Sequence, residues 1–463
     1  MFRTGANKGG LRLKTSIVAA GLLLLLLGAR AEAAMAQDAA NSSSASSAAE
    51  GLTLTGAVEL ALKQNLDVQI ANIETASEQQ DRALARAELL PQAGFDGDDA
   101  MTRYNTKAQL GVQPAIIPHA VGPYQAIHMG PTFSTPAFDL TLIDQYQASG
   151  HRLLASRADE QTVREETVLL TVSEYMAHLR ALASITAAES RVELAGRLAR
   201  QAQDLLNDGV ASKIDVSRAQ VRLTEEKQGL IDAQRDADTT LDALKSILNV
   251  PASEQIEVAD QQDFFSTPAL DLSDPLTTAI QQRPELHSRS ESIKAADLAH
   301  RAAVAESLPT LKFDGYWGEQ GETFDTSTPG YQYRVSLKVP IFTSERLRAE
   351  RKSTALAELR AEKELEQERN QVTEQVSDGQ VELQAALHQV ELGRQQVQLA
   401  NEEVTLSQGR FQAGVTDNIE VTQAQDSLAR ANDAEIGALY RYNIARAQLA
   451  RAVGSEQQTY THF

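Results

Sequence analysis

The 463-residue chain contains no cysteine, a single tryptophan and few aromatic residues. The absence of cysteine excludes disulfides, thiol catalysis and thiolate metal sites, and it excludes a lipid-bearing cysteine behind an export signal. Basic residues are fewer than acidic ones, and the formal net charge is −20. Nucleic-acid binding needs clustered lysine and arginine, so this composition argues against a nucleic-acid partner.

Long apolar runs are also missing, apart from one near the start. Residues 17–27 are apolar, follow a basic head and precede a series of small residues. This order is typical of a secretory signal peptide, so we predict a signal at residues 1–36 and a polar, flexible leader at 37–51. The run is too short to span a bilayer and no later run is longer, which excludes a helical membrane protein. An exported chain without cysteine fits a bacterial envelope protein.

The chain repeats itself. The segment L-P-Q-A-G-F-D-G at 90–97 is matched by L-P-T-L-K-F-D-G at 308–315, and L-N-D-G-V-A-S-K-I-D-V at 206–216 is matched by F-Q-A-G-V-T-D-N-I-E-V at 411–421. Each copy is predicted to run from a helix through a Leu-Pro break and a strand pair to a long helix, a Gly-Val turn and another helix. Such an order, written twice, indicates a duplicated structural unit.

This comparison divides the exported part of the chain. We predict a first structural repeat at 52–250, a linker at 251–274, a second repeat at 275–454 and a C-terminal tail at 455–463. The first copy is longer between its strands than the second. We therefore interpret its proline-rich residues 102–135 as a long loop.

Heptad spacing predicts coiled-coil helices in both repeats. From Val421 to Ala452, positions spaced alternately by three and four residues are almost all apolar or aromatic, which indicates a coiled-coil seam. The same phase recurs in the first repeat from Val216 to Ile247. Alanine is frequent in these seams, so neighbouring helices can approach closely.

The helix predicted at 345–411 carries two apolar rows with seven-residue spacing. The first row comprises Val376, Leu383, Val390, Val397, Val404 and Phe411, and the second comprises Leu392, Leu399 and Leu406. The rows are offset by two positions, or ~200°, so they lie on nearly opposite sides of a helix ~100 Å long. A helix with a neighbour on each side suits a closed ring of helices better than a dimeric coiled coil.

Residues 331–341 alternate strictly between apolar and polar side chains. An alternating strand with aromatics at one end is typical of a transmembrane β-barrel. Its partner begins at Thr310, and Phe95 and residues 133–138 mark the equivalent pair in the first repeat. About four strands per chain cannot close around a lumen, and lipid does not tolerate open sheet edges. Several chains must share one barrel, and three chains with twelve strands are the simplest solution that leaves a passage.

The export signal, the duplicated helix–strand pair–helix plan and the paired Gly-Val turns resemble the TolC-like outer-membrane efflux proteins, over about residues 52–454. The resemblance implies a mixed α and β membrane protein: a homotrimeric 12-stranded β-barrel, four strands per chain, continuous with a long α-helical coiled-coil barrel. It implies contact with outer-membrane lipid, a periplasmic extension, and docking to a periplasmic membrane-fusion adaptor and an inner-membrane pump. The expected function is a passive exit duct of a tripartite efflux or type I secretion system.

In such proteins the two glycine-containing turns lie at the periplasmic tips of the helical hairpins, where they meet the adaptor and line the closing aperture. The matching residues are Gly209, Val210, Ala211, Ser212, Gly414, Val415, Thr416 and Asp417. Glycine permits positive φ where a helix ends, and Ser212 or Asp417 can cap the next helix. The turns are therefore also explained as well-formed hairpin ends.

Asp215 and Glu420 each follow a tip glycine at the same spacing, and the resemblance makes them candidates for an aperture gate. Threefold symmetry would bring such carboxylates into a ring, where they repel one another and bind cations unless paired. The chain departs from one known pattern, because Gln423 is not a second acid and Thr416 stands where a linking arginine can occur. The alternative is that both are first-turn acids favoured by the helix dipole.

Signs of chemistry are weak. The eight histidines show no ligand spacing, and the chain has no nucleophile elbow, P-loop or dinucleotide fingerprint, so we expect no enzyme, no cofactor and no metal. A copper site at His128-Met129 and a calcium loop at Asp96, Asp98 and Asp99 are less favoured than incidental or strand-face polarity. The alternative function is a periplasmic coiled-coil adaptor or scaffold without a pore, which would not need the alternation at 331–341. A wide duct need not recognise its cargo, so no substrate or pump class follows.

Overall fold

The computed structural model describes residues 51–461, except 107, 109, 110, 112–115, 117, 210, 261–273, 324, 414 and 417, and of residue 418 it describes only the backbone. The predicted signal peptide therefore lies outside the described residues. In chain order the elements are α2 (Leu54–Gln64), α3 (Leu66–Ala87), β1 (Gln92–Asn105), β2 (Ala120–Phe138), α5 (Leu140–Asn207), α6 (Lys213–Ile247), α7 (Pro275–Gln282), α8 (Pro284–Ala305), β3 (Thr310–Gly321), β4 (Thr328–Lys338), α9 (Arg346–Gln412), α10 (Asn418–Val453) and α11 (Glu456–Thr461).

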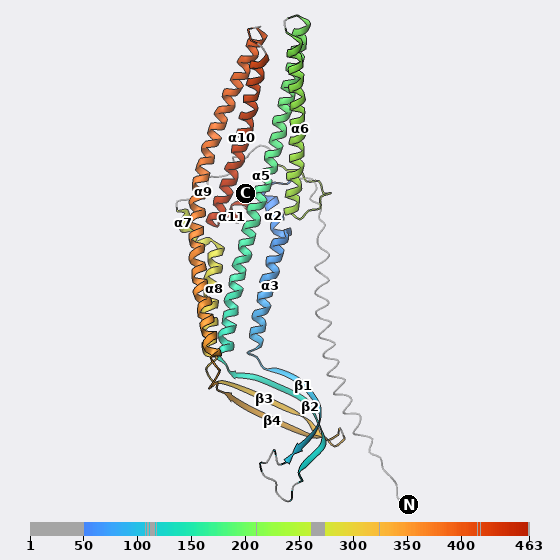
Figure 1. Cartoon of the computed structure of the whole chain (residues 1–463), viewed down its shortest axis with the longest axis vertical. Helices are drawn as coiled ribbons and strands as arrows, with labels where there is room; N and C mark the ends of the chain where they lie inside the picture. Colours follow the sequence, from blue (N-terminus) through green and yellow to red (C-terminus); the bar gives the residue numbers. More distant parts are fainter. Residues whose placement is uncertain are drawn as a thin grey trace, which may run out of the picture. The chain divides into compact units, whose positions relative to one another are not determined.

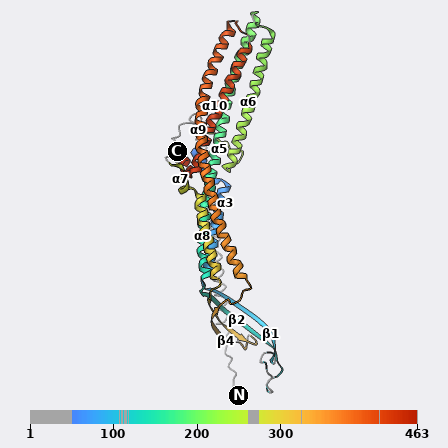
Figure 2. The same ribbon diagram turned by 60° about the vertical axis from the view of Figure 1, so that its left-hand side comes forward.

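The same order of elements occurs twice within the unit that begins at Leu52. Two helices, two strands and a long helical hairpin form α2 to α6, and the same series forms α7 to α10. Helices α5 and α9 contain 68 and 67 residues, so each is ~100 Å long at 1.5 Å per residue. The strands lie at one end of these helices, and both hairpins turn at the other end (Figures 1 and 2). Among the described helices, none is both long and apolar enough to cross a membrane.

The hairpins form a layer in which α5 contacts α6, α10 contacts α9, and α10 contacts α5. Helices α9 and α6 lie on the two outer sides of this layer (Figure 1). The predicted seam of α10 is buried in the layer, including Val421, Ala424, Ala431, Ala438, Ala445 and Leu449. Small residues bring the backbones together: a Cβ added to Gly393 of α9 would lie 3.2 Å from the Cα of Glu435.

The two apolar rows of α9 have different surroundings. Val376, Val390, Val404 and Phe411 of the first row are buried, mainly against α10. Leu392, Leu399 and Leu406 of the second row are 64%, 65% and 69% exposed. The prediction that the two rows lie on different sides of one long helix is confirmed, and one chain covers only one of them.

An apolar core cluster lies where α2, α5 and α6 meet, between the strand end and the hairpin end. Its members include Val58, Val168, Val172, Tyr175, Leu244 and Leu248. The single O–H of Tyr175 is shared between two acceptors, Asp260 Oδ2 (2.7 Å) and the Leu52 carbonyl (2.9 Å). Residues distant in sequence are thereby fixed at the middle of the helical layer.

The strands form one antiparallel sheet in the order β1-β2-β3-β4. Cross-strand partners share a face, because side chains alternate along each strand. One face is apolar and includes Phe95, Phe133, Phe313, Trp317, Tyr331, Tyr333 and Val335, whereas the other includes Asp96, Asp98, His128, Thr132, Lys312, Asp314 and Arg334. The alternation predicted for the second repeat is confirmed, although β4 begins and ends three residues earlier than 331–341.

The interpretation of residues 102–135 as a loop is wrong for most of the segment. Strand β2 begins at Ala120 and pairs with both β1 and β3, so Pro123, Pro131 and Pro136 lie within a strand. The register shifts opposite Pro123 and beside Pro136. Such irregularities allow proline, which lacks a ladder N–H, to remain in a paired strand.

Candidate functional site: hairpin tips and a buried charge cluster

The first hairpin turns between α5 and α6. Gly209 adopts φ +77°, which is the left-handed conformation that favours glycine at a helix end. Its N–H donates to the Leu206 carbonyl (3.1 Å), and the N–H of Ala211 donates to the Leu205 carbonyl (3.0 Å). These bonds satisfy the last carbonyls of α5, so the glycine is explained by the turn itself. Val210 lies outside the described residues.

Asp215 is engaged in a capping box at the start of α6. Its Oδ2 accepts hydrogen bonds from the N–H (3.0 Å) and the hydroxyl (2.6 Å) of Ser212, while its own N–H donates to Ser212 Oγ at 3.4 Å. The hydrogen bonds from Ser212 lower the pKa of Asp215. The predicted cap at Ser212 is confirmed. The geometry favours the first-turn explanation for Asp215, and its role at an aperture stays a prediction.

In the second hairpin, Glu420 links the two arms. Its Oε2 accepts a hydrogen bond from Thr416 Oγ1 (2.6 Å), and its Oε1 lies 3.1 Å from Nε of Arg410, in the last turn of α9. The sequence has Thr416 where a linking arginine can occur, so we expected no such arginine in this hairpin. Arg410 supplies that charge from the other helix, which sequence reasoning missed. Gly414 and Asp417 lie outside the described residues.

Both tips present apolar side chains to solvent. Val415 is 68% exposed in the second turn, and the equivalent first-turn residues Ile214 and Ile419 are 57% and 42% exposed. Sequence reasoning named Val415 but neither isoleucine, although the repeated segments align them.

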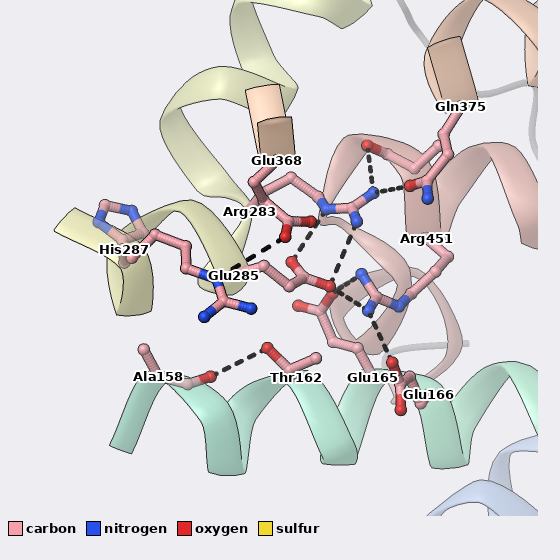
Figure 3. A network of polar contacts seen from close by, with 12 residues as sticks. Ala158, Thr162, Glu165, Glu166, Arg283, Glu285, His287, Glu368, Gln375 and Arg451 are labelled. Carbon is pink, nitrogen blue, oxygen red and sulfur yellow. Dashed lines mark hydrogen bonds and ion pairs between the residues drawn. The ribbon is translucent and has the colours of Figure 1, made fainter. Parts of the chain in front are cut away.

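A cluster of buried charges joins the two repeats (Figure 3). Arg451 of α10 donates to Glu285 of α8 and lies 3.5 Å from Glu165 of α5. Arg283, at the α7–α8 junction, pairs with Glu285 (Nε to Oε2, 3.0 Å) and donates to Gln375 Oε1 of α9 (2.8 Å). Four long helices are thus connected through two arginines. Sequence reasoning did not find this cluster, because its members show no local pattern.

Glu456 of α11 adds a carboxyl group that is completely buried. Neither of its oxygens has a hydrogen-bond partner among the described residues. Burial raises the pKa of Glu456 well above its ordinary value, against the attraction of Arg451. Burial also raises the pKa of Glu165. For Glu285 burial acts in the same direction, but Arg451 and Arg283 outweigh it and the pKa is lowered.

No group of three or more His, Asp or Glu side chains within the described part of the chain is arranged to hold a metal ion. His128 and Met129 are consecutive in β2, and Asp98 and Asp99 are consecutive in β1. Neighbouring strand residues point to opposite faces. His128 and Met129 therefore face away from each other, and Asp99 faces away from Asp96 and Asp98, so neither candidate set converges on one ion.

Residues 57–250 and 276–455 match the model of the outer membrane efflux protein family. The chain therefore belongs to this family. It is 22% identical over 417 residues to the probable efflux pump outer membrane protein TtgC of Pseudomonas putida KT2440, covering 86% of this chain and 82% of that protein. It is 24% identical over 312 residues to outer membrane protein TolC of Vibrio cholerae serotype O1, covering 65% and 71%. The solved outer-membrane channel OprN shares the fold, with a TM-score of 0.78 at 18% identity over 87% of this chain and 90% of that one.

These findings confirm the predicted TolC-like fold and its internal duplication, since the family model matches two separate segments. The chain is an outer-membrane efflux or secretion channel. The family is one of channels and not of enzymes.

We expect Glu456→Gln to change how the stability of the protein depends on pH. A raised folded-state pKa means that the contribution of Glu456 to stability is full at low pH and is lost as pH rises through that pKa. Thermal unfolding followed by circular dichroism should show the wild type losing stability relative to the variant as the pH rises above the ordinary range of a glutamate carboxyl.

Glu166→Gln is the matched control, because Glu166 also contacts Arg451 (3.6 Å) but its side chain is 64% exposed. This control should leave the pH dependence unchanged. A difference between wild type and Glu456→Gln that is constant with pH would contradict the buried, proton-holding carboxyl.

Proposed function

We propose that three copies of the chain form one exit duct, after removal of the signal at residues 1–36. The observation that carries this proposal is the sheet itself, which has four strands, one apolar face and two edges, β1 and β4, that pair with no other strand in the described part of the chain. Open edges are not tolerated in lipid. Twelve strands from three chains close the edges and leave a lumen.

The helical layer supports the same arrangement. The exposed leucines of α9 face away from α10, and α6 on the other side of the layer exposes Val221 and Ile231. In a ring of identical copies, one outer helix of each chain meets the other outer helix of the next. The exposed apolar rows of α9 and α6 would then be buried between neighbouring chains, and the hairpins would surround a periplasmic tunnel.

The hairpin tips would contact a periplasmic adaptor, which connects the duct to an inner-membrane pump. The exposed Val415, Ile214 and Ile419 support a docking role for the residues around Gly209 and Gly414. Movement of cargo would be passive, because the family has no catalytic function and the pump would supply the energy. A pore-free periplasmic scaffold is disfavoured, since it would not need the apolar face of the sheet.

The helix interface is tested by Leu399→Glu. A charge buried between α9 and the next chain costs several kcal/mol, so the heat-sensitive trimer band of outer-membrane fractions should be weakened or lost. Asn401→Asp is the control, because this exposed residue lies about 200° around α9 from Leu399. A trimer unaffected by Leu399→Glu would contradict the proposed interface between α9 and the next chain. A wild-type protein found as a soluble periplasmic monomer would contradict the proposed duct.

The docking role is tested by Ala211→Trp and Gly414→Pro. Either change should abolish export while the trimer still forms, because a bulky or rigid tip no longer fits the adaptor. Export is measured as cargo or drug release from cells that depend on this channel. Asp236→Trp, which is exposed on α6 away from the tip and lies about 140° around the helix from Ile231, should export normally. Normal export by both tip variants would refute docking.

The gate is tested by Glu420→Ala. Loss of the carboxylate removes one charge per chain from the proposed aperture and breaks the link to Arg410, so single-channel conductance in planar bilayers should rise. Glu403→Ala removes an exposed acid that lies on α9 farther from the tip, and it should leave conductance unchanged. An unchanged conductance in Glu420→Ala would contradict the gate and leave Glu420 only the role of linking the two helices of the hairpin.

A further inference from the structure

We propose that Arg334 on the β4 edge forms an ion pair with Asp96 or Asp98 on the β1 edge of the neighbouring chain, on the inner face of the barrel. This inference rests on the proposed trimer and specifies how its chains are joined. The register pairs Gln92 with Ser134, Ser134 with Asp314 and Asp314 with Arg334. Because cross-strand partners share a face and side chains alternate, Asp96 and Asp98 lie on the same polar face as Arg334.

The two edges carry opposite charges on this face. The acidic residues are Asp96 and Asp98 on β1, and the basic residues are Arg334 and Lys338 on β4. Pairing two β1 edges would bring carboxylates together, and pairing two β4 edges would bring cations together. Like charges placed opposite one another are destabilising. The charges therefore favour β4 against β1, which is the head-to-tail contact that closes a ring.

The charges at the edges are not neutralised within their own chain. Asp314 lies across the ladder from Arg334 but pairs with Lys312 (3.0 Å). Arg334 donates only to the neutral Gln332 (3.3 Å) among the described residues. Asp96 accepts from Thr132 Oγ1 (2.8 Å), and Asp98 lies 3.3 Å from His128 Nδ1. On the β4 edge, Arg334 has no carboxylate partner among the described residues. On the β1 edge, Asp96 and Asp98 have no lysine or arginine partner among them.

Barrel geometry brings these groups to the same level. In a barrel whose strands are tilted by about 35–45° and spaced about 4.8 Å apart, the strand register is offset by about 4–6 residues for every four strands crossed. Arg334 is level with Gln92 of its own chain, so it meets a residue about 4–6 positions from Gln92 in the next chain. The shared face requires an even shift, which selects Asp96 or Asp98.

The direction of the shift follows from the lengths of the elements. A shift toward higher numbers keeps Thr328–Lys338 opposite Gln92–Asn105, so all of β4 is paired. A shift toward lower numbers would set Arg334 against residues at the end of α3, which stops at Ala87. Most of β4 would then have no partner strand. Only the first direction closes the barrel.

The absence of cysteine makes the junction directly testable by crosslinking. Asp96→Cys/Arg334→Cys and Asp98→Cys/Arg334→Cys are expressed in the full chain and oxidised in outer membranes. Directly opposed residues on antiparallel strands have Cα atoms about 4.5–5.5 Å apart, within disulfide range. We expect covalent dimers and trimers on boiled, non-reducing gels from at least one pair. Asp99→Cys/Arg334→Cys is the control and should give none, because Asp99 lies on the opposite face.

Charge reversal tests the ion pair itself. Arg334→Glu should lower the temperature at which the trimer dissociates, and Asp96→Arg/Asp98→Arg/Arg334→Glu should restore most of the loss. Trimers that form without either crosslink would overturn this junction while leaving the proposed duct intact, whereas no trimer in the wild type would overturn the duct. Crosslinks accompanied by no effect of Arg334→Glu would overturn the ion pair.

Discussion

Strands β1 and β4 each have one edge that pairs with no other strand among the described residues of the chain, and the apolar face of the sheet suits lipid. Lipid offers no hydrogen bonds, and each unsatisfied group there costs several kcal/mol. In lipid, a single chain would therefore leave the outer edges of its sheet without hydrogen-bond partners. In the proposed duct, head-to-tail closure of the barrel would pair the two sheet edges, and the helical layers of the copies would join into a ring.

The helical layer also has a surface that one chain leaves uncovered, in this case a row of apolar side chains. One row of α9 is buried against α10, while a second row, including Leu399, remains exposed. Between the strand end and the hairpin end, the buried cluster of Arg283, Glu285 and Arg451 joins α5, α8, α9 and α10. Buried ion pairs contribute little net stability but strongly penalise the loss of one partner. The cluster therefore fixes how the two repeats meet more than it stabilises them.

The hairpin tips show how one feature serves local structure before function. Gly209 ends a helix, Ser212 and Asp215 start the next, and Glu420 ties α9 to α10 through Arg410. The side chains of Ser212, Asp215 and Glu420 all have partners within the chain. Apolar Val415 remains exposed at the extremity. In the proposed docking role, a turn whose polar side chains are paired locally leaves its exposed apolar groups free for a partner protein.

The sequence by itself determined the duplication, the heptad seam from Val421, the alternating strands of the second repeat and the cap at Ser212. These features depend on periodicity and on contacts between residues a few positions apart. Only the tertiary structure decided that β2 continues through its prolines, because pairing on both sides outweighs a local breaker. It alone brought Arg451 to Glu165, 286 positions away, and Arg410 to Glu420 across a turn. Such partners come from different helices, and no local pattern records which side chains folding will bring together.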